Sequence, residues 1–141
     1  MNGIRIFIDT NILIYAFSSN EPAKQKAALN YLDKYIPVIS TQVLKEFTNV
    51  LLKKTNFDSQ HIKNLISEIV TVAEIADETV SHVVKALELN DHYGYSFYDC
   101  LIIAAAIHSN CTILLSEDMQ NNQMIDKKLQ IINPFEIQHG K

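Results

Sequence analysis

Short apolar runs alternate along the chain with longer segments whose apolar residues recur every three or four positions. The short runs predict buried strands over residues 4–8, 37–39, 70–75, 112–115 and 129–132. The longer segments predict helices over residues 12–17, 23–35, 41–54, 59–69, 78–89 and 96–109, with a polar loop over 90–95. Because strands and helices alternate, the pattern favours an α/β fold with a mainly parallel sheet. Ligands of such sheets bind beyond the carboxyl ends of the strands.

The expected helices differ in how their apolar residues are distributed. Helix 41–54 has one apolar stripe at a helical period, made of Val43, Leu44, Phe47, Val50 and Leu51. Helix 78–89 likewise has apolar residues on one face, namely Val80, Val83, Val84 and Leu87. Helix 96–109 is apolar nearly all round, so we expect it to be buried on most sides.

Length and composition predict one soluble domain over residues 1–141. The chain is 48% hydrophobic and 20% charged, with no internal repeat or low-complexity segment. Its longest apolar run covers residues 100–107, far short of the roughly 18 residues of a membrane-spanning helix. Cys100 and Cys111 belong to no C-x-x-C motif, and two free buried thiols are typical of a reducing cytoplasm.

Charge is distributed unevenly, although the net charge is only −4. Residues 1–64 carry a balance of +3, whereas residues 65–141 carry −7. Solvated helix faces are the simplest explanation. The alternative is a basic flank in the first half that attracts a phosphate backbone.

Two acidic residues follow predicted strands, and two lie near the starts of predicted helices. Asp9 ends the first strand, and Asp118 comes shortly after residue 115. Each could simply cap a helix or turn. Glu46 lies on helix 41–54 at the border of its apolar stripe, where a surface glutamate is the simplest interpretation.

Asp99 is the most informative of the four acids. Ser96-Phe97-Tyr98-Asp99 fits a helix-capping box. The helix that it opens is apolar all round, however, and a buried helix start is a costly place for a carboxylate unless a cation or the helix amides neutralise it.

All four positions belong to one edge of a parallel α/β sheet. Converging carboxylates repel one another unless a cation lies among them. Oxygen ligands suit Mg²⁺ or Mn²⁺ better than Zn²⁺. The histidines show no ligand spacing; they are His61, His82, His92, His108 and His139. The sequence therefore predicts a Mg²⁺ or Mn²⁺ site suited to phosphodiester hydrolysis, formed by Asp9, Glu46, Asp99 and Asp118.

Each of the four acids lies in a short motif, and the motifs follow one another along the chain. They are Asp9-Thr10-Asn11, the segment Ser40 to Phe47 with Glu46, the segment Ser96 to Ile102 with Asp99, and the segment Leu115 to Gln120 with Asp118. In this order they resemble the PIN-domain nucleases, and especially the toxins of bacterial type II toxin–antitoxin pairs. The resemblance implies a three-layer α/β/α fold whose mainly parallel sheet has four or five strands. It also implies a metal-dependent endoribonuclease, often a homodimer, that a small antitoxin silences.

The resemblance also assigns roles to single residues. Asp9, Glu46, Asp99 and Asp118 would be the acidic quartet that binds the metal. Asn11 and Ser116 would be polar neighbours of that quartet; the family often has threonine at the second position. Glu117 is an alternative acid beside Asp118.

Two other functions remain open at the level of sequence. Asp9 after a strand could open an aspartyl-phosphate phosphatase, although such enzymes need a second acid two residues later, where this chain has Asn11. The fold could also serve as a catalytically silent scaffold that only binds a partner.

Overall fold

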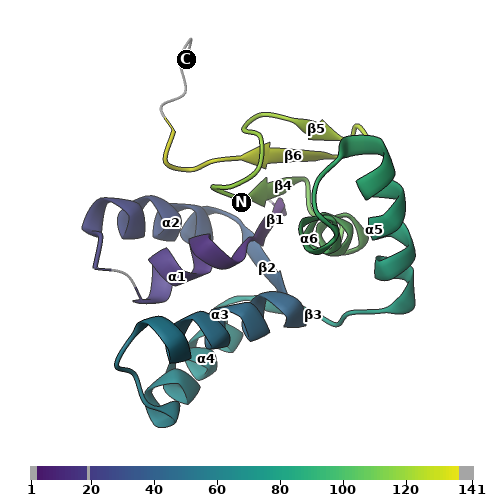
Figure 1. Cartoon of the computed structure of the whole chain (residues 1–141). Helices are drawn as coiled ribbons and strands as arrows, with labels where there is room; N and C mark the ends of the chain where they lie inside the picture. Colours follow the sequence, from purple (N-terminus) through teal and green to yellow (C-terminus); the bar gives the residue numbers. More distant parts are fainter. Residues whose placement is uncertain (1–2, 19, 137–141) are drawn as a thin grey trace.

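A computed structural model describes residues 3–18 and 20–136 (Figure 1). The elements are, in order, β1 (Arg5–Ile8), α1 (Thr10–Ser18), α2 (Pro22–Lys34), β2 (Ile36–Ser40), α3 (Thr41–Lys54), α4 (Ser59–Val72), β3 (Glu74–Ala76), α5 (Val80–Tyr93), α6 (Phe97–His108), β4 (Ile113–Leu115), β5 (Met124–Ile125) and β6 (Leu129–Ile132). None of the helices formed by the described residues combines the length and the hydropathy that a membrane crossing requires.

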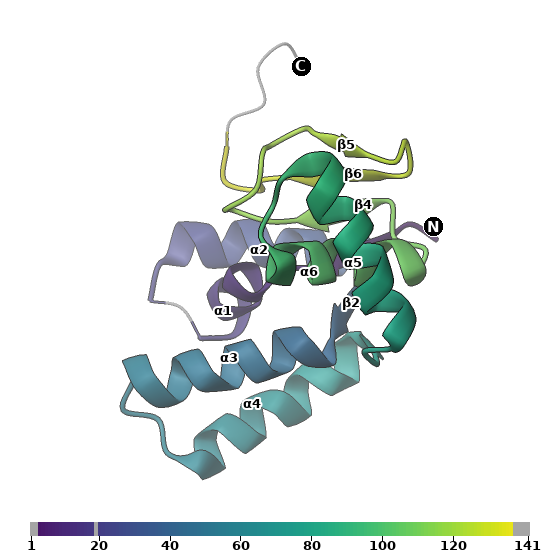
Figure 2. The ribbon, with the colours of Figure 1, turned by 45° about the vertical axis from the view of Figure 1, so that its right-hand side comes forward.

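The strands form one sheet in the order β3-β2-β1-β4-β6-β5, with helices on both sides. All neighbouring pairs are parallel except β5 and β6, which are antiparallel. In Figures 1 and 2, α5 and α6 lie on one side of the sheet, α1 and α2 on the other, and α3 and α4 run together beyond it. The three-layer α/β/α architecture with a mainly parallel sheet is therefore confirmed.

The sheet has six strands rather than the expected four or five, because the sequence pattern missed β5. This strand has only two residues and pairs with β6 through a tight turn at Asp126 and Lys127. Both turn residues adopt positive φ, 52° and 57°, a conformation for which glycine is the usual sequence signal. Hydrogen bonds from Lys85 and Tyr93 to the Asp126 carboxylate tie this turn to α5.

Two predicted boundaries were wrong. A strand was expected over residues 70–75, but α4 continues to Val72 and β3 covers only Glu74–Ala76. The helical stripe of Ile62, Leu65 and Ile69 is buried against the core, and this packing overrides the β propensity of the valines that follow. The loop expected over 90–95 begins later, because α5 runs to Tyr93 and ends at Gly94 with φ +81°.

The apolar face expected on helix 78–89 lies toward solvent. Val80 is 80% exposed and Leu87 57% exposed, whereas the residues of α5 that are buried are His82, Ala86 and Leu89. In contrast, α6 is buried over seven consecutive residues, from Cys100 to Ala106, as its all-round apolar sequence predicts. Cys100 and Cys111 are both free and buried, as expected.

No loop separates β2 from α3, and Ser40 serves both elements. It is the last residue of β2 and the N-cap of α3, with its hydroxyl accepting a hydrogen bond from the Val43 amide at 3.3 Å. The strand end therefore fixes where α3 starts and which side chains its first turns direct back toward the sheet.

Replacing Ser40 with alanine should lower the free energy of unfolding by about 1 kcal/mol, since that is the usual cost of losing an N-cap side chain. Urea denaturation checks this value. Ser81→Ala, at an exposed serine inside α5, is the matched control and should cost nothing. Equal stability of the Ser40 variant and the wild type would show that this cap does not stabilise α3.

Candidate active site

A pocket of about 280 Å³ contains all four acids that the sequence singled out. It lies where β1, β2 and β4 end, the carboxyl edge of the sheet. The lining residues are Asp9, Thr10, Asn11, Glu46, Asn49, Val50, Asp99 and Asp118. These come from the end of β1, from α1, α3 and α6, and from the turn after β4.

Asp9 lies at the base of this pocket, between β1 and α1. Its Oδ1 accepts a hydrogen bond from the Thr10 amide at 2.7 Å, and its Oδ2 accepts one from the Ser116 hydroxyl at 2.9 Å. Burial raises the pKa of Asp9 to about 6, against the lowering effect of these two bonds, and the charges of Asp99 and Glu46 raise it further. Asp9 is thus a carboxylate whose charge is not neutralised by its surroundings.

Ser116 joins Asp9 to the turn that carries Asp118. Its side chain is fully buried, and its oxygen also accepts hydrogen bonds from the amides of Asp118 and Met119, each at 3.3 Å. From α1, the Asn11 amide donates to Asp118 Oδ2 at 3.0 Å. Asn11 and Ser116 therefore lie next to the acids, where the resemblance put them.

Glu117, the alternative acid, points elsewhere. Its Oε2 lies 2.8 Å from Lys24 Nζ, and its Oε1 accepts a hydrogen bond from the Tyr15 hydroxyl at 3.0 Å. The Lys24 amine also lies over the Tyr15 ring, 4.6 Å from its centroid. Glu117 is not among the residues that line the pocket, so the geometry favours Asp118 over Glu117.

Both oxygens of Glu46 are held by neutral donors. The Thr10 hydroxyl donates to Oε1 at 2.5 Å, and the Gln42 amide donates to Oε2 at 3.0 Å. Glu46 is half-buried, at the border of the α3 stripe where the periodicity put it. The weakest candidate on sequence grounds is therefore firmly oriented in the folded chain.

Asp99 lies in the first turn of α6, as expected for a capping box. Its amide donates to the Ser96 hydroxyl at 3.2 Å, so the backbone makes the capping bond and the carboxylate lines the pocket. Burial raises the pKa of Asp99, and the charges of Asp118 and Glu46 raise it further. The cap and the pocket interpretations of Asp99 are compatible.

Reasoning from sequence missed several residues around the pocket. Thr10 and Gln42 hydrogen bond to Glu46, while Asn49 and Val50 line the wall formed by α3. One signal was available, since Gln42 and Glu46 are four residues apart and such a pair meets on a helix. Thr10 and Glu46 are 36 residues apart, and only the fold brings them together.

The chemistry of the donors fits a hard divalent cation. Four carboxylates share the pocket, and the salt bridges among residues 3–18 and 20–136 include none of them. The four acids are spread around the pocket, and among the same residues no three His, Cys, Asp or Glu side chains form a compact cluster that could hold a metal ion directly. Mg²⁺ keeps several of its waters and takes only one or two carboxylates directly, so it suits acids that are spread around a pocket.

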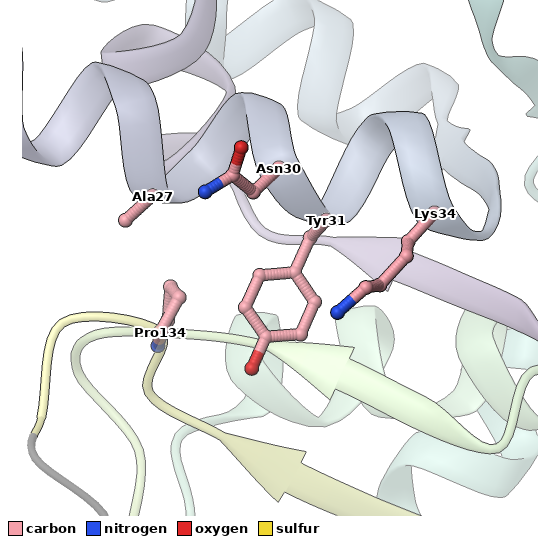
Figure 3. A pocket seen from close by; sticks show the side chains of 5 residues that line it. All are labelled: Ala27, Asn30, Tyr31, Lys34 and Pro134. Atoms are coloured by element: carbon pink, nitrogen blue, oxygen red, sulfur yellow. The ribbon is translucent and has the colours of Figure 1, made fainter.

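A pocket between α2 and the chain after β6 lacks this chemistry. It has a volume of about 250 Å³ and is lined by Ala27, Asn30, Tyr31, Lys34 and Pro134 (Figure 3). In Figure 3 the Tyr31 ring reaches from α2 toward the segment that carries Pro134. No carboxylate lines it. Of the histidines, His82 and His108 pack against each other with ring centroids 4.7 Å apart, and His139 lies outside the described residues.

A family model for the PIN domain matches residues 6–124, which include all four pocket acids. The chain belongs to the PIN domain family. The family expected from the motifs is therefore confirmed. A sequence comparison with curated proteins gives no match.

Solved structures with the same fold include proteins of toxin–antitoxin systems. A toxin–antitoxin complex from Klebsiella pneumoniae is similar over 94% of this PIN-domain chain and 99% of its own, with a TM-score of 0.70 and 20% identity. VapC20 of Mycobacterium tuberculosis, described as a toxin that cleaves the sarcin–ricin loop, gives 0.65 and 18% identity over 80% of this chain and 91% of its own. VapBC2 of Rickettsia felis, bound to a DNA fragment from its promoter, has a TM-score of 0.63 and 19% identity. The similarity covers 91% of this chain and 97% of its own. At these identities the likeness concerns the fold.

Proposed function

We propose that this PIN-domain protein is a Mg²⁺- or Mn²⁺-dependent endoribonuclease and the toxin of a toxin–antitoxin pair. One observation carries the proposal: four carboxylates from four separate segments line a single pocket at the carboxyl edge of the sheet, with no ion pair to a basic side chain within the described residues. Such a set is electrostatically costly without a cation. A divalent cation bound by these residues would supply the positive charge that activates water and stabilises the charge developing on a phosphodiester.

The chain's own residues divide the work as follows. Asp9, Asp99 and Asp118 would hold the metal, one or two of them directly and the rest through its bound waters. Glu46 would complete the metal's surroundings or orient the attacking water. Asn11 and Ser116 keep Asp118 and Asp9 in place through the hydrogen bonds described above.

RNA fits this site as a substrate for electrostatic reasons. The helix α3, which carries Glu46, ends in two exposed lysines, Lys53 and Lys54. Exposed lysines attract a phosphate backbone, whereas the acidic pocket alone would repel it unless a metal were bound. Tyr98, beside Asp99, is 65% exposed and offers a ring on which a base can stack.

The structural neighbours support the proposed role as a toxin. The K. pneumoniae structure is a toxin–antitoxin complex, and the M. tuberculosis protein is described as a toxin that cleaves the sarcin–ricin loop. By analogy we propose a small antitoxin as the partner, a homodimer as the assembly, the cytoplasm as the compartment, and one nuclease domain over residues 1–141.

Neither rival function has a specific contact in its favour. An aspartyl-phosphate phosphatase would need an acid at the position of Asn11, whose amide instead donates to Asp118. A silent scaffold would have no need for four carboxylates in one pocket.

The purified wild type should cleave RNA when Mg²⁺ or Mn²⁺ is present and should stop when EDTA is added, since carboxylates alone supply no charge that stabilises the transition state. Gel analysis of total RNA, with the ends of the fragments mapped, measures this. Cleavage restored by Mn²⁺ after EDTA separates metal removal from damage to the protein. Equal cleavage with and without EDTA would contradict the proposal, and a phosphorylated Asp9 would favour the phosphatase instead.

A further inference from the structure

Gln42 is a buried polar residue that touches two of the pocket's elements. It lies in the first turn of α3, and only 7% of its surface is exposed. Its Nε2 donates to Glu46 Oε2 at 3.0 Å and to the backbone carbonyl oxygen of Tyr98 at 3.3 Å. Tyr98 directly precedes Asp99, so one amide group links the Glu46 carboxylate to the turn of α6 that carries Asp99.

The chemistry of the amide determines which groups Gln42 can link. An NH₂ group donates two hydrogen bonds and accepts none, so both of its partners must be acceptors. The carboxylate of Glu46 and the Tyr98 carbonyl meet that requirement. With the Thr10 hydroxyl on the other oxygen of Glu46, the carboxylate has a donor on each side and one preferred orientation.

The link also joins two acids that are distant in the sequence. Glu46 and Asp99 belong to α3 and α6, which are separated by α4, β3 and α5 along the chain. No salt bridge joins α3 to α6 within the described residues. Gln42 therefore links the positions of these two acids through hydrogen bonds.

We propose that Gln42 is a positioning residue that presents Glu46 and Asp99 together to the divalent cation. The inference rests on the proposed function and deepens it. Gln42 does not line the pocket and does not itself bind the metal. It acts through Glu46, as the hydrogen-bonded neighbours of metal ligands commonly do.

Gln42→Met tests this role, because methionine keeps the length and burial of the side chain but removes both donors. Mn²⁺ affinity, measured by isothermal titration calorimetry on the metal-free protein, should fall about 10- to 100-fold. The midpoint of thermal unfolding in EDTA should fall only modestly, since the Glu46 carboxylate and the Tyr98 carbonyl lose a donor while the volume of the buried side chain is kept.

Gln60→Met is the matched control. Gln60 Nε2 also donates to a residue four positions later on the same helix, Asn64, at 3.0 Å, but α4 lies away from the pocket. This variant should bind Mn²⁺ as the wild type does.

A double-mutant cycle shows whether Gln42 acts through Glu46. In a Glu46→Gln background, adding Gln42→Met should weaken Mn²⁺ binding less than it does in the wild type, because the carboxylate that Gln42 orients is already gone and only the link to the Tyr98 carbonyl remains to be lost. Independent, additive losses would overturn the inference. So would wild-type affinity in Gln42→Met, even if the wild type binds Mn²⁺ and cleaves RNA. If the wild type binds no Mn²⁺, the proposed function fails first and the inference with it.

Discussion

Replacing Asp99 with asparagine is expected to reduce Mg²⁺-dependent RNA cleavage at least 100-fold while the chain stays folded. Loss of a hydrogen-bonded neighbour of a metal ligand costs about 10- to 100-fold, so loss of a direct carboxylate ligand should cost about 100-fold or more. The fold should survive because the capping bond of α6 runs from the Asp99 backbone amide to the Ser96 hydroxyl, and asparagine keeps this amide. In the wild type the charges of Asp118 and Glu46 repel the Asp99 carboxylate and raise its pKa. The asparagine side chain carries no charge, so the variant is free of this repulsion.

Single-turnover cleavage of a defined RNA at saturating Mg²⁺ measures the loss, and circular dichroism checks the fold. Asp91→Asn makes the same chemical change at an exposed acid of α5 and should leave the rate unchanged. A purified Asp99→Asn protein that cut RNA at the wild-type rate would remove Asp99 from the site. An equal loss in Asp91→Asn would mean that net charge, and not this carboxylate, governs cleavage.

Sequence patterns located three of the acids because their positions relative to strands and helices can be recognised in the sequence. Asp9 and Asp118 follow buried strands, and parallel strands bring their carboxyl ends to one edge. Asp99 opens a helix that is apolar all round, so its burial near the core could be anticipated. The fold class followed from the same alternation of strands and helices, and α3 matched its expected range of residues 41–54.

What escaped prediction depends on contacts between distant segments. The Thr10 hydroxyl reaches Glu46 only because α1 and α3 lie side by side, and the Gln42 amide reaches the Tyr98 carbonyl only because α6 crosses near the start of α3. Lys24, one of the two partners of Glu117, lies on α2, 93 residues away. The spacing of residues within one helix or strand does not reveal such contacts.

Local propensity failed where tertiary packing opposed it. The valines at the end of α4 favour a strand, yet the buried stripe of that helix keeps them helical. On α5 the most apolar face is exposed, because the smaller Ala86 and the capping-box residue His82 face α6 instead. A hydrophobic stripe therefore predicted the helix correctly but not the direction in which it faces.

Asp9→Asn is expected to stabilise the metal-free protein near neutral pH while abolishing metal binding. Burial raises the pKa of Asp9 to about 6 in the folded chain, whereas an unfolded aspartate titrates near about 3.9. Between these values the folded state binds more protons than the unfolded state, so the free energy of unfolding falls as the pH rises through about 6. Asparagine has no charge to desolvate, so the variant should escape this loss.

The expected gain is about 1–3 kcal/mol at about pH 7.5, since each pKa unit corresponds to about 1.4 kcal/mol. It should shrink toward zero below about pH 4, where Asp9 is protonated in both states. Urea denaturation of both proteins in EDTA at several pH values measures the difference, and Asp91→Asn should show no such pH dependence. Added Mn²⁺ should reverse the order, because a ligand that binds only the folded wild type stabilises it and leaves the variant unchanged. If the wild type is as stable as Asp9→Asn at every pH without metal, the charge of Asp9 is not costly, and the electrostatic case for a cation in this pocket is lost.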